Sequence, residues 1–241
     1  MGVLGGSFRL GGQWEPCKGL YGYSRGMELV GVPVGTVRVF WGAGNDVHVQ
    51  GTSAAAEVVA ETIRQWWPDH TVSRADVAWD VDAEGSFDRL YQRIHELART
   101  NPRGKVSTST AGDWLDREGG RTFYAGGRSS RVYLRCYQKG HEQLAKDPTC
   151  GASLDWTRVE WVLRPTSDQK AWLAHASKAE ALGLSAFGAA VADDLLGSET
   201  VAVGNTLRFA SQYPAYWMVK QYRRVVLSLL ELDATDMRQV L

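Results

Sequence analysis

Alternation of apolar and polar residues in three segments is the feature that most constrains the fold of this 241-residue chain. Side chains alternate across a β-strand, so residues two apart lie on the same face. Over residues 73–82, 131–139 and 156–163, one face is apolar and the other carries charged and polar groups. This pattern predicts antiparallel strands that pack one face against helices and leave the opposite face open.

The rest of the chain predicts an α+β fold, with a mostly antiparallel central sheet, helices on one face and a helical C-terminal region. We therefore expect an α+β domain over residues 1–165 and a helical extension over residues 166–241 packed on it. Further strands are expected at residues 37–41, 46–50, 106–110 and 121–125. Helices are expected at residues 52–67, 86–99, 168–182 and 215–232.

Charge is balanced over the chain as a whole but segregated along it. Lys and Arg together number 27, as do Asp and Glu, whereas a DNA-binding protein usually has a basic excess. Residues 117–146 nevertheless hold seven Lys or Arg against two acids, and residues 76–88 hold five acids and no base. Such segregation can place an anion-binding site beside a cation-binding site.

Cysteine content and hydropathy indicate the compartment. The three cysteines have no metal-ligand spacing, and an odd number argues against a disulfide framework. No apolar run approaches the roughly 18 residues needed to cross a bilayer. We expect a cytoplasmic protein without membrane contact.

The polar face has the residue types needed for phosphoryl transfer. Asp76, Asp80 and Asp82 share one face of one strand and repel one another, and a divalent cation such as Mg²⁺ or Mn²⁺ would relieve that repulsion. A tyrosine on such a face can attack a phosphodiester and form a covalent phosphotyrosine. Tyr137 is the first choice because Arg135 and Lys139 flank it; Tyr133 is the second. The alternative is a solvated sheet surface with no chemistry.

Three arginines surround the Gly126-Gly127 turn between two expected strands. Arg121, Arg128 and Arg131 are predicted to bind the phosphates of a DNA strand, and an exposed hairpin rim is the alternative interpretation.

Several motifs occur in one order along the chain: Ser73-Arg-Ala-Asp-Val-Ala-Trp-Asp-Val-Asp82, Arg121-Thr-Phe-Tyr-Ala-Gly-Gly-Arg-Ser-Ser130, Leu134-Arg-Cys-Tyr-Gln-Lys-Gly-His-Glu142 and Arg158-Val-Glu160. Together with Gly22-Tyr-Ser-Arg-Gly26 and Val47-His-Val-Gln-Gly51 upstream, they resemble the rolling-circle replication initiation factors. These are tyrosine-dependent initiators of filamentous phages and small plasmids, with related relaxases of conjugative transposons. The resemblance covers residues 18–165.

The resemblance implies a nicking enzyme that cuts one strand of single-stranded or melted origin DNA. Tyr137 would keep the 5′ phosphate covalently and leave a 3′ hydroxyl for a polymerase, with Arg135 and Lys139 as the neighbouring basic residues. Asp76, Asp80 and Glu160 match the family's acidic positions and would bind Mg²⁺ or Mn²⁺. Host helicase and polymerase are candidate partners. The helix at residues 215–232 is expected to pack against the rest of the chain, and a homodimer surface is the alternative interpretation.

Two other classes of function stay open. One is a non-catalytic regulator that binds origin or operator DNA, which needs neither Tyr137 nor metal. The other is a metal-dependent nuclease that uses water as its nucleophile. The sequence does not decide whether Asp82, His48 or Glu142 joins the metal site.

Overall fold

The computed structural model describes residues 10–33, 35–44 and 46–197, and the helix expected at residues 215–232 lies outside them. These residues form two compact units, each with its own antiparallel sheet. Within the described residues, the first unit comprises those from 10 to 75 together with 164–177, and the second comprises 76–163 together with 178–197. This division differs from the expected boundary at residue 165, because residues 164–177 belong to the first unit whereas residues 178–197 belong to the second.

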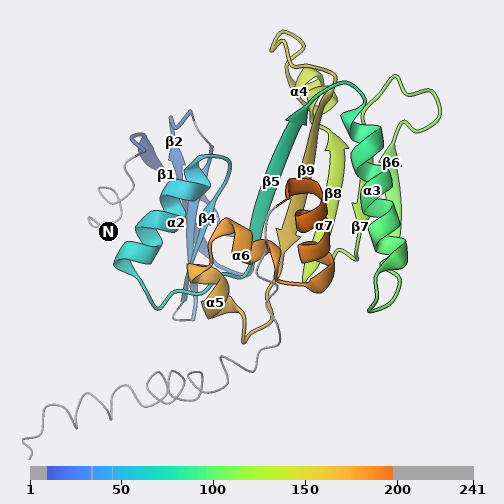
Figure 1. Ribbon diagram of the computed structural model, residues 1–241. Helices are drawn as coiled ribbons and strands as arrows, with labels where there is room; N and C mark the ends of the chain where they lie inside the picture. The colour runs from blue at the N-terminus through green and yellow to red at the C-terminus, as the bar shows by residue number, and fades with distance from the viewer. Residues whose placement is uncertain (1–9, 34, 45, 198–241) are drawn as a thin grey trace, which may run out of the picture. The chain divides into compact units, whose positions relative to one another are not determined.

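The first unit is a four-stranded sheet in sequential order with α2 packed on one face (Figure 1). Its core contains Leu29, Val37, Ala55 and Val59. The Arg64 guanidinium donates to the carbonyls of Ala174 and Ala176 (2.8 and 3.1 Å), which attaches the end of α5 to α2. Its elements are β1 (Gln13–Lys18), β2 (Arg25–Val30), β3 (Val37–Ala43), β4 (Asp46–Gly51), α2 (Ala55–Trp66) and α5 (Lys170–His175).

The second unit is a five-stranded sheet in the order β5-β9-β8-β7-β6. Figure 1 shows α3 and α7 on one face of this sheet, where they contact β8 and each other. Its elements are β5 (Ala75–Asp82), α3 (Ser86–Thr100), β6 (Thr108–Gly112), β7 (Arg121–Ala125), β8 (Val132–Gln138), α4 (Lys139–Lys146), β9 (Trp156–Leu163), α6 (Lys178–Leu182) and α7 (Ala186–Leu196).

The core of the second unit lies between the sheet and its helices. Trp161 and Leu134 from the sheet and Ile94 from α3 are almost completely buried. The Trp161 indole donates to the carbonyl of Gly188 (3.3 Å), which fixes α7 against β9. The expected α+β class, with helices on one face of an antiparallel sheet, is confirmed for this unit.

Several expected elements are confirmed, and others differ for identifiable reasons. The hairpin expected at residues 37–41 and 46–50 is present, but in a sheet separate from that of the other predicted strands. The helix expected over 168–182 is divided into α5 and α6. The helix α7 was not predicted, because its sequence is apolar on nearly all sides and shows little 3.6-residue periodicity.

No helix within the described part of the chain is both long and apolar enough to span a bilayer.

Candidate active site

The face of the second sheet opposite α3 and α7 gathers polar side chains from β5, β9 and β8. Tyr137 pairs with Arg158 across β8 and β9, and Arg135 pairs with Glu160 two residues further along. Asp76 and Asp80 lie on the adjacent strand β5, whose exposure alternates residue by residue. The predicted alternation therefore places these groups on one surface.

Asp76 and Glu160 form a close carboxyl pair between β5 and β9. Asp76 lies close enough to Glu160 for its charge to act on the Glu160 carboxyl. Burial raises the pKa of Glu160, and the nearby Asp76 raises it further, although Arg135, 3.1 Å away, acts in the opposite direction. A cation bound between two such carboxyl groups would reduce the repulsion between their charges, so the pair is suited to bind one.

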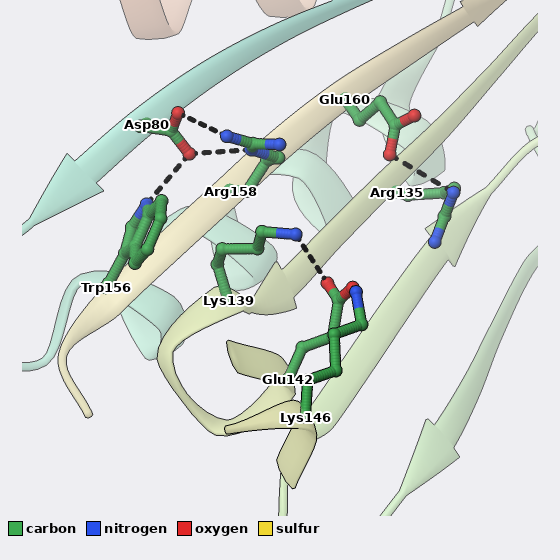
Figure 2. A network of polar contacts seen from close by, with 8 residues as sticks. All are labelled: Asp80, Arg135, Lys139, Glu142, Lys146, Trp156, Arg158 and Glu160. Atoms are coloured by element: carbon green, nitrogen blue, oxygen red, sulfur yellow. Dashed lines mark hydrogen bonds and ion pairs between the residues drawn. The ribbon is translucent and has the colours of Figure 1, made fainter. Parts of the chain in front are cut away.

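Asp80 forms an ion pair with a cationic side chain of the protein, Arg158. Its two carboxylate oxygens accept hydrogen bonds from the Arg158 guanidinium, both at 2.7 Å, and one also accepts from the Trp156 indole at 2.9 Å (Figure 2). Burial alone raises the pKa of Asp80, but these hydrogen bonds outweigh it, so the pKa lies below its ordinary value. Asp80 therefore holds Arg158 in place.

Tyr137 lies among these charged groups with only 8% of its surface exposed. Burial, followed by the charges of Glu160 and Glu142, raises the pKa of its phenol to about 12. The Arg158 guanidinium lies beside its hydroxyl, and the Arg135 guanidinium lies 5.2 Å from the ring centre. The positive charges predicted around Tyr137 are present, but burial and carboxylates have the larger effect on its pKa.

Lys139 is the first residue of α4 rather than the last residue of a strand. Its ammonium lies 5.7 Å from the centre of the Tyr137 ring and donates to Glu142 at 2.8 Å. Lys146 also binds Glu142 (Figure 2). Burial raises the pKa of Glu142, and the two lysines outweigh that effect and lower it. Both carboxylate oxygens of Glu142 thus form ion pairs with lysines.

Tyr133, the second choice of nucleophile, lies in a different environment. Its ring stacks on Tyr124, with centroids 5.5 Å apart and planes at 8°. Burial raises the pKa of its phenol, and a hydrogen bond with Arg128 acts in the opposite direction. Its cross-strand neighbour is Val162 rather than a charged residue.

Of the three arginines predicted to bind DNA phosphates, Arg121 lies apart from the other two. Arg121 is only 6% exposed, pairs with Asp88 at 3.0 Å, and lies 4.5 Å from the centre of the Phe87 ring. This is a structural contact between β7 and α3, so the geometry does not support the predicted phosphate contact of Arg121. Arg128 and Arg131 are exposed at the β7–β8 turn.

The donor set on this face fits a hard divalent cation through two ligands. Mg²⁺ typically binds one or two carboxylates and completes its shell with water and substrate phosphate oxygens, which suits Asp76 and Glu160. Among the residues that the structure describes, no group of three or more His, Cys, Asp or Glu is arranged to hold a metal. His48 belongs to the first unit.

Arg158 and Trp156 are the polar-face residues to which sequence analysis gave no role. The parity of β9 already places Arg158 with Glu160, which is the signal that identifies it. Its bidentate bond to Asp80 depends on the pairing of distant strands and could not be deduced from either segment alone.

Comparison with known proteins gives two likenesses. The replication initiation factor family matches residues 70–192, which is more than half of the chain. Among solved structures, the chain is similar to the rolling circle replication initiator protein from Geobacillus stearothermophilus, at 21% identity and a TM-score of 0.45, over 77% of this chain and 68% of that one. No curated protein matches. The span matched by the family contains every polar-face residue described above.

Proposed function

The chain belongs to the replication initiation factor family, and from this premise and the site geometry we propose that it is a rolling-circle initiator that nicks one DNA strand with Tyr137. The observation that carries this proposal is that Tyr137 pairs with Arg158 across β8 and β9, on the same sheet face as Asp76 and Glu160. A nucleophile, fixed cations and two hard metal ligands are the groups that transfer of a phosphodiester to tyrosine requires.

In the proposed reaction the Tyr137 oxygen attacks the scissile phosphorus and the bond from phosphorus to the 3′ oxygen breaks. The tyrosine proton passes to solvent, and the 3′ oxygen takes up a proton and becomes a free 3′ hydroxyl. The 5′ phosphate stays on Tyr137 as a phosphodiester. The number of phosphodiester bonds is conserved, so no external energy source is needed.

The cations of this face have distinct parts in the proposal. Arg158 stabilises charge on the phosphate oxygens, and Asp80 positions it through the two 2.7 Å hydrogen bonds. Arg135 and Lys139 add positive charge near the Tyr137 ring, at 5.2 and 5.7 Å from its centre. Asp76 and Glu160 would hold Mg²⁺ or Mn²⁺, which polarises the scissile phosphate when bound. We assign Asp80 to Arg158 rather than to the metal.

The phenol pKa of about 12 explains why metal is part of this proposal. Glu160 is one of the charges that raise this pKa, and a cation on Glu160 would offset its charge. Without such a cation the phenolate is scarce at neutral pH, and nicking should be slow.

The test is covalent capture of DNA. Single-stranded oligonucleotides that tile the replicon encoding this chain are labelled at the 3′ end, because the 3′ fragment is the part retained on tyrosine. Incubation with Mn²⁺ should give a labelled protein band that survives denaturing electrophoresis. Tyr137→Phe should reduce this band roughly 1,000-fold or more, whereas Tyr133→Phe should keep it.

Each of the other possible results would indicate a different function or a different nucleophile. Cleavage retained in Tyr137→Phe without an adduct indicates a nuclease that uses water. Binding without cleavage indicates a DNA-binding regulator. An adduct that survives in Tyr137→Phe but disappears in Tyr133→Phe would move the nucleophile to Tyr133.

A further inference from the structure

The first unit has an aromatic cluster that the proposed reaction does not use: Tyr21, Tyr23, Phe40 and His48. Phe40 and His48 pair across β3 and β4 and stack with centroids 6.1 Å apart. By strand parity they lie on the face opposite Val37, which belongs to the core under α2. Tyr23 stacks on His48 at 6.0 Å, and Tyr21 packs edge-on against His48 at 5.2 Å.

Tyr21 presents this cluster to solvent. It is 67% exposed although a tyrosine ring is largely apolar, while Phe40 beneath it is completely buried. The Tyr21 backbone adopts a left-handed conformation, with φ of 56°, which is uncommon for a residue other than glycine. The fold thus maintains an exposed ring on a fixed aromatic base.

The turn that holds Tyr21 is fixed on both sides. The amide of Tyr23 donates to the carbonyl of Leu20 (3.0 Å), and the Ser24 hydroxyl donates to the carbonyl of Gly42 on β3 (3.2 Å). A side chain at Gly42 would meet the Ser24 hydroxyl at 2.4 Å, so glycine permits this close approach. The ring is therefore preorganised rather than carried on a loose loop.

Positive charge surrounds the same turn. Lys18 and Arg25 face each other as the last residue pair of β1 and β2, and both are exposed. Like charges directly opposite each other weaken a strand pair. Neither forms an ion pair within the described part of the chain, and residues 18–25 contain no acid. An external anion would relieve this repulsion.

We propose that the β1–β2 turn binds single-stranded DNA, with one base stacked on Tyr21 and flanking phosphates bound by Lys18 and Arg25. An exposed aromatic ring between cations suits an unpaired nucleotide, because every base has a face that can stack. A duplex hides its bases and could use only the cations. The inference rests on the proposed function for its choice of DNA as ligand, and it adds a binding site outside the catalytic sheet.

The test measures binding without cleavage, in the Tyr137→Phe background, by fluorescence anisotropy of a labelled single-stranded oligonucleotide. Tyr21→Ala should weaken binding roughly 5- to 100-fold, and Tyr21→Phe should retain it, since stacking needs the ring and not the hydroxyl. Trp66→Ala, which removes another exposed aromatic ring of the same unit (59% exposed), is the matched control and should leave the affinity unchanged.

The charge component has its own readout. Replacing both Lys18 and Arg25 with Gln should reduce the slope of log affinity against log salt by about 1.4, at about 0.7 for each lost phosphate contact with a single strand. Tyr21→Ala should weaken binding without changing this slope.

Photocrosslinking tests the contact between Tyr21 and a base directly, in a protein whose β1–β2 turn carries no substitution. An oligonucleotide carrying 5-iododeoxyuridine should crosslink to Tyr21 under ultraviolet light. The proposal is overturned if Tyr21→Ala binds single strands within about twofold of its parent, if duplex binding weakens equally, or if crosslinks avoid the turn. Failure of Tyr137 to form an adduct would leave all these measurements unaffected, so the two proposals fail separately.

Discussion

At the residue scale, Asp76 and Glu160 are the carboxyl groups on which the proposed metal site depends. The raised pKa of Glu160 shows that its environment disfavours a second negative charge beside Asp76. Arg135 compensates only in part, since it acts against burial and Asp76 together. A divalent cation is the ligand that removes this remaining repulsion.

A stability measurement tests the pair through pH. Because the folded-state pKa of Glu160 is raised, its contribution to stability is present below its unfolded pKa and is lost as pH rises through the folded value. In metal-free buffer, Glu160→Gln should therefore be at least as stable as the parent at neutral pH, and this advantage should disappear in acid. Thermal unfolding from about pH 4 to pH 8 measures the difference.

The same variants test the metal. Mn²⁺ at 100 times its dissociation constant should stabilise the parent by about 2.7 kcal/mol, and Glu160→Gln should lose most of this effect. Glu142→Gln removes a carboxylate that forms ion pairs with two lysines, and this variant should still be stabilised by Mn²⁺. Equal stabilisation of all three proteins would contradict a metal site at Asp76 and Glu160.

At the scale of elements, the strands that carry the polar face are held by contacts made on their opposite face. Ser86, the first residue of α3, donates to the carbonyl of Asp155 (2.9 Å), and its hydroxyl lies 2.7 Å from that of Thr157 on β9. The Arg121–Asp88 pair joins the same helix to β7. α3 thus connects two strands of the sheet from behind the polar face.

Removing the Ser86 hydroxyl should weaken this connection without touching the polar face. Ser86 and Thr157 are each 1% exposed, so Ser86→Ala leaves buried polar groups without their partner and should cost roughly 1–3 kcal/mol. Urea unfolding of Ser86→Ala, Thr157→Val and the double variant should show a double-variant cost below the sum of the single costs. Strictly additive costs would mean that the two hydroxyls act independently.

At the scale of the whole molecule, the balanced charge limits how the protein can bind DNA. With 27 basic and 27 acidic residues, there is no general attraction to a polyanion. Under the two proposals, affinity comes from local groups, namely the cations of the polar face of the second sheet and of the β1–β2 turn. Stacking at that turn is available only to unpaired bases.

We therefore expect a preference for single-stranded over duplex DNA. At about 150 mM salt, an oligonucleotide should bind the Tyr137→Phe protein at least roughly 10-fold more tightly than its duplex of the same length. Anisotropy titration of both forms measures the ratio. Equal affinities would indicate that phosphate contacts alone account for binding.

The polar face was predictable from the sequence because alternation along a strand is a local property. No knowledge of the fold is needed to see that Asp76 and Asp80 share one side of their strand. The same holds for Arg158 and Glu160 on theirs. The same reasoning explains Arg121, which shares its parity with Phe123 and Ala125 and was therefore placed by its own strand on the buried face. The prediction of Arg121 as a DNA contact rests on its position near the Gly126-Gly127 turn, whereas the alternation of β7 places it among buried residues.

The sequence by itself determined which residues share a face, because side-chain direction follows from the geometry of one strand. Only the tertiary structure decided which of them meet. β5 and β9 are separated by more than 70 residues in the sequence. Because they are neighbours in the sheet, Asp76 lies near Glu160 and Asp80 binds Arg158. The structure also decided that the strands form two sheets, since strand pairing depends on contacts between segments that no local pattern specifies.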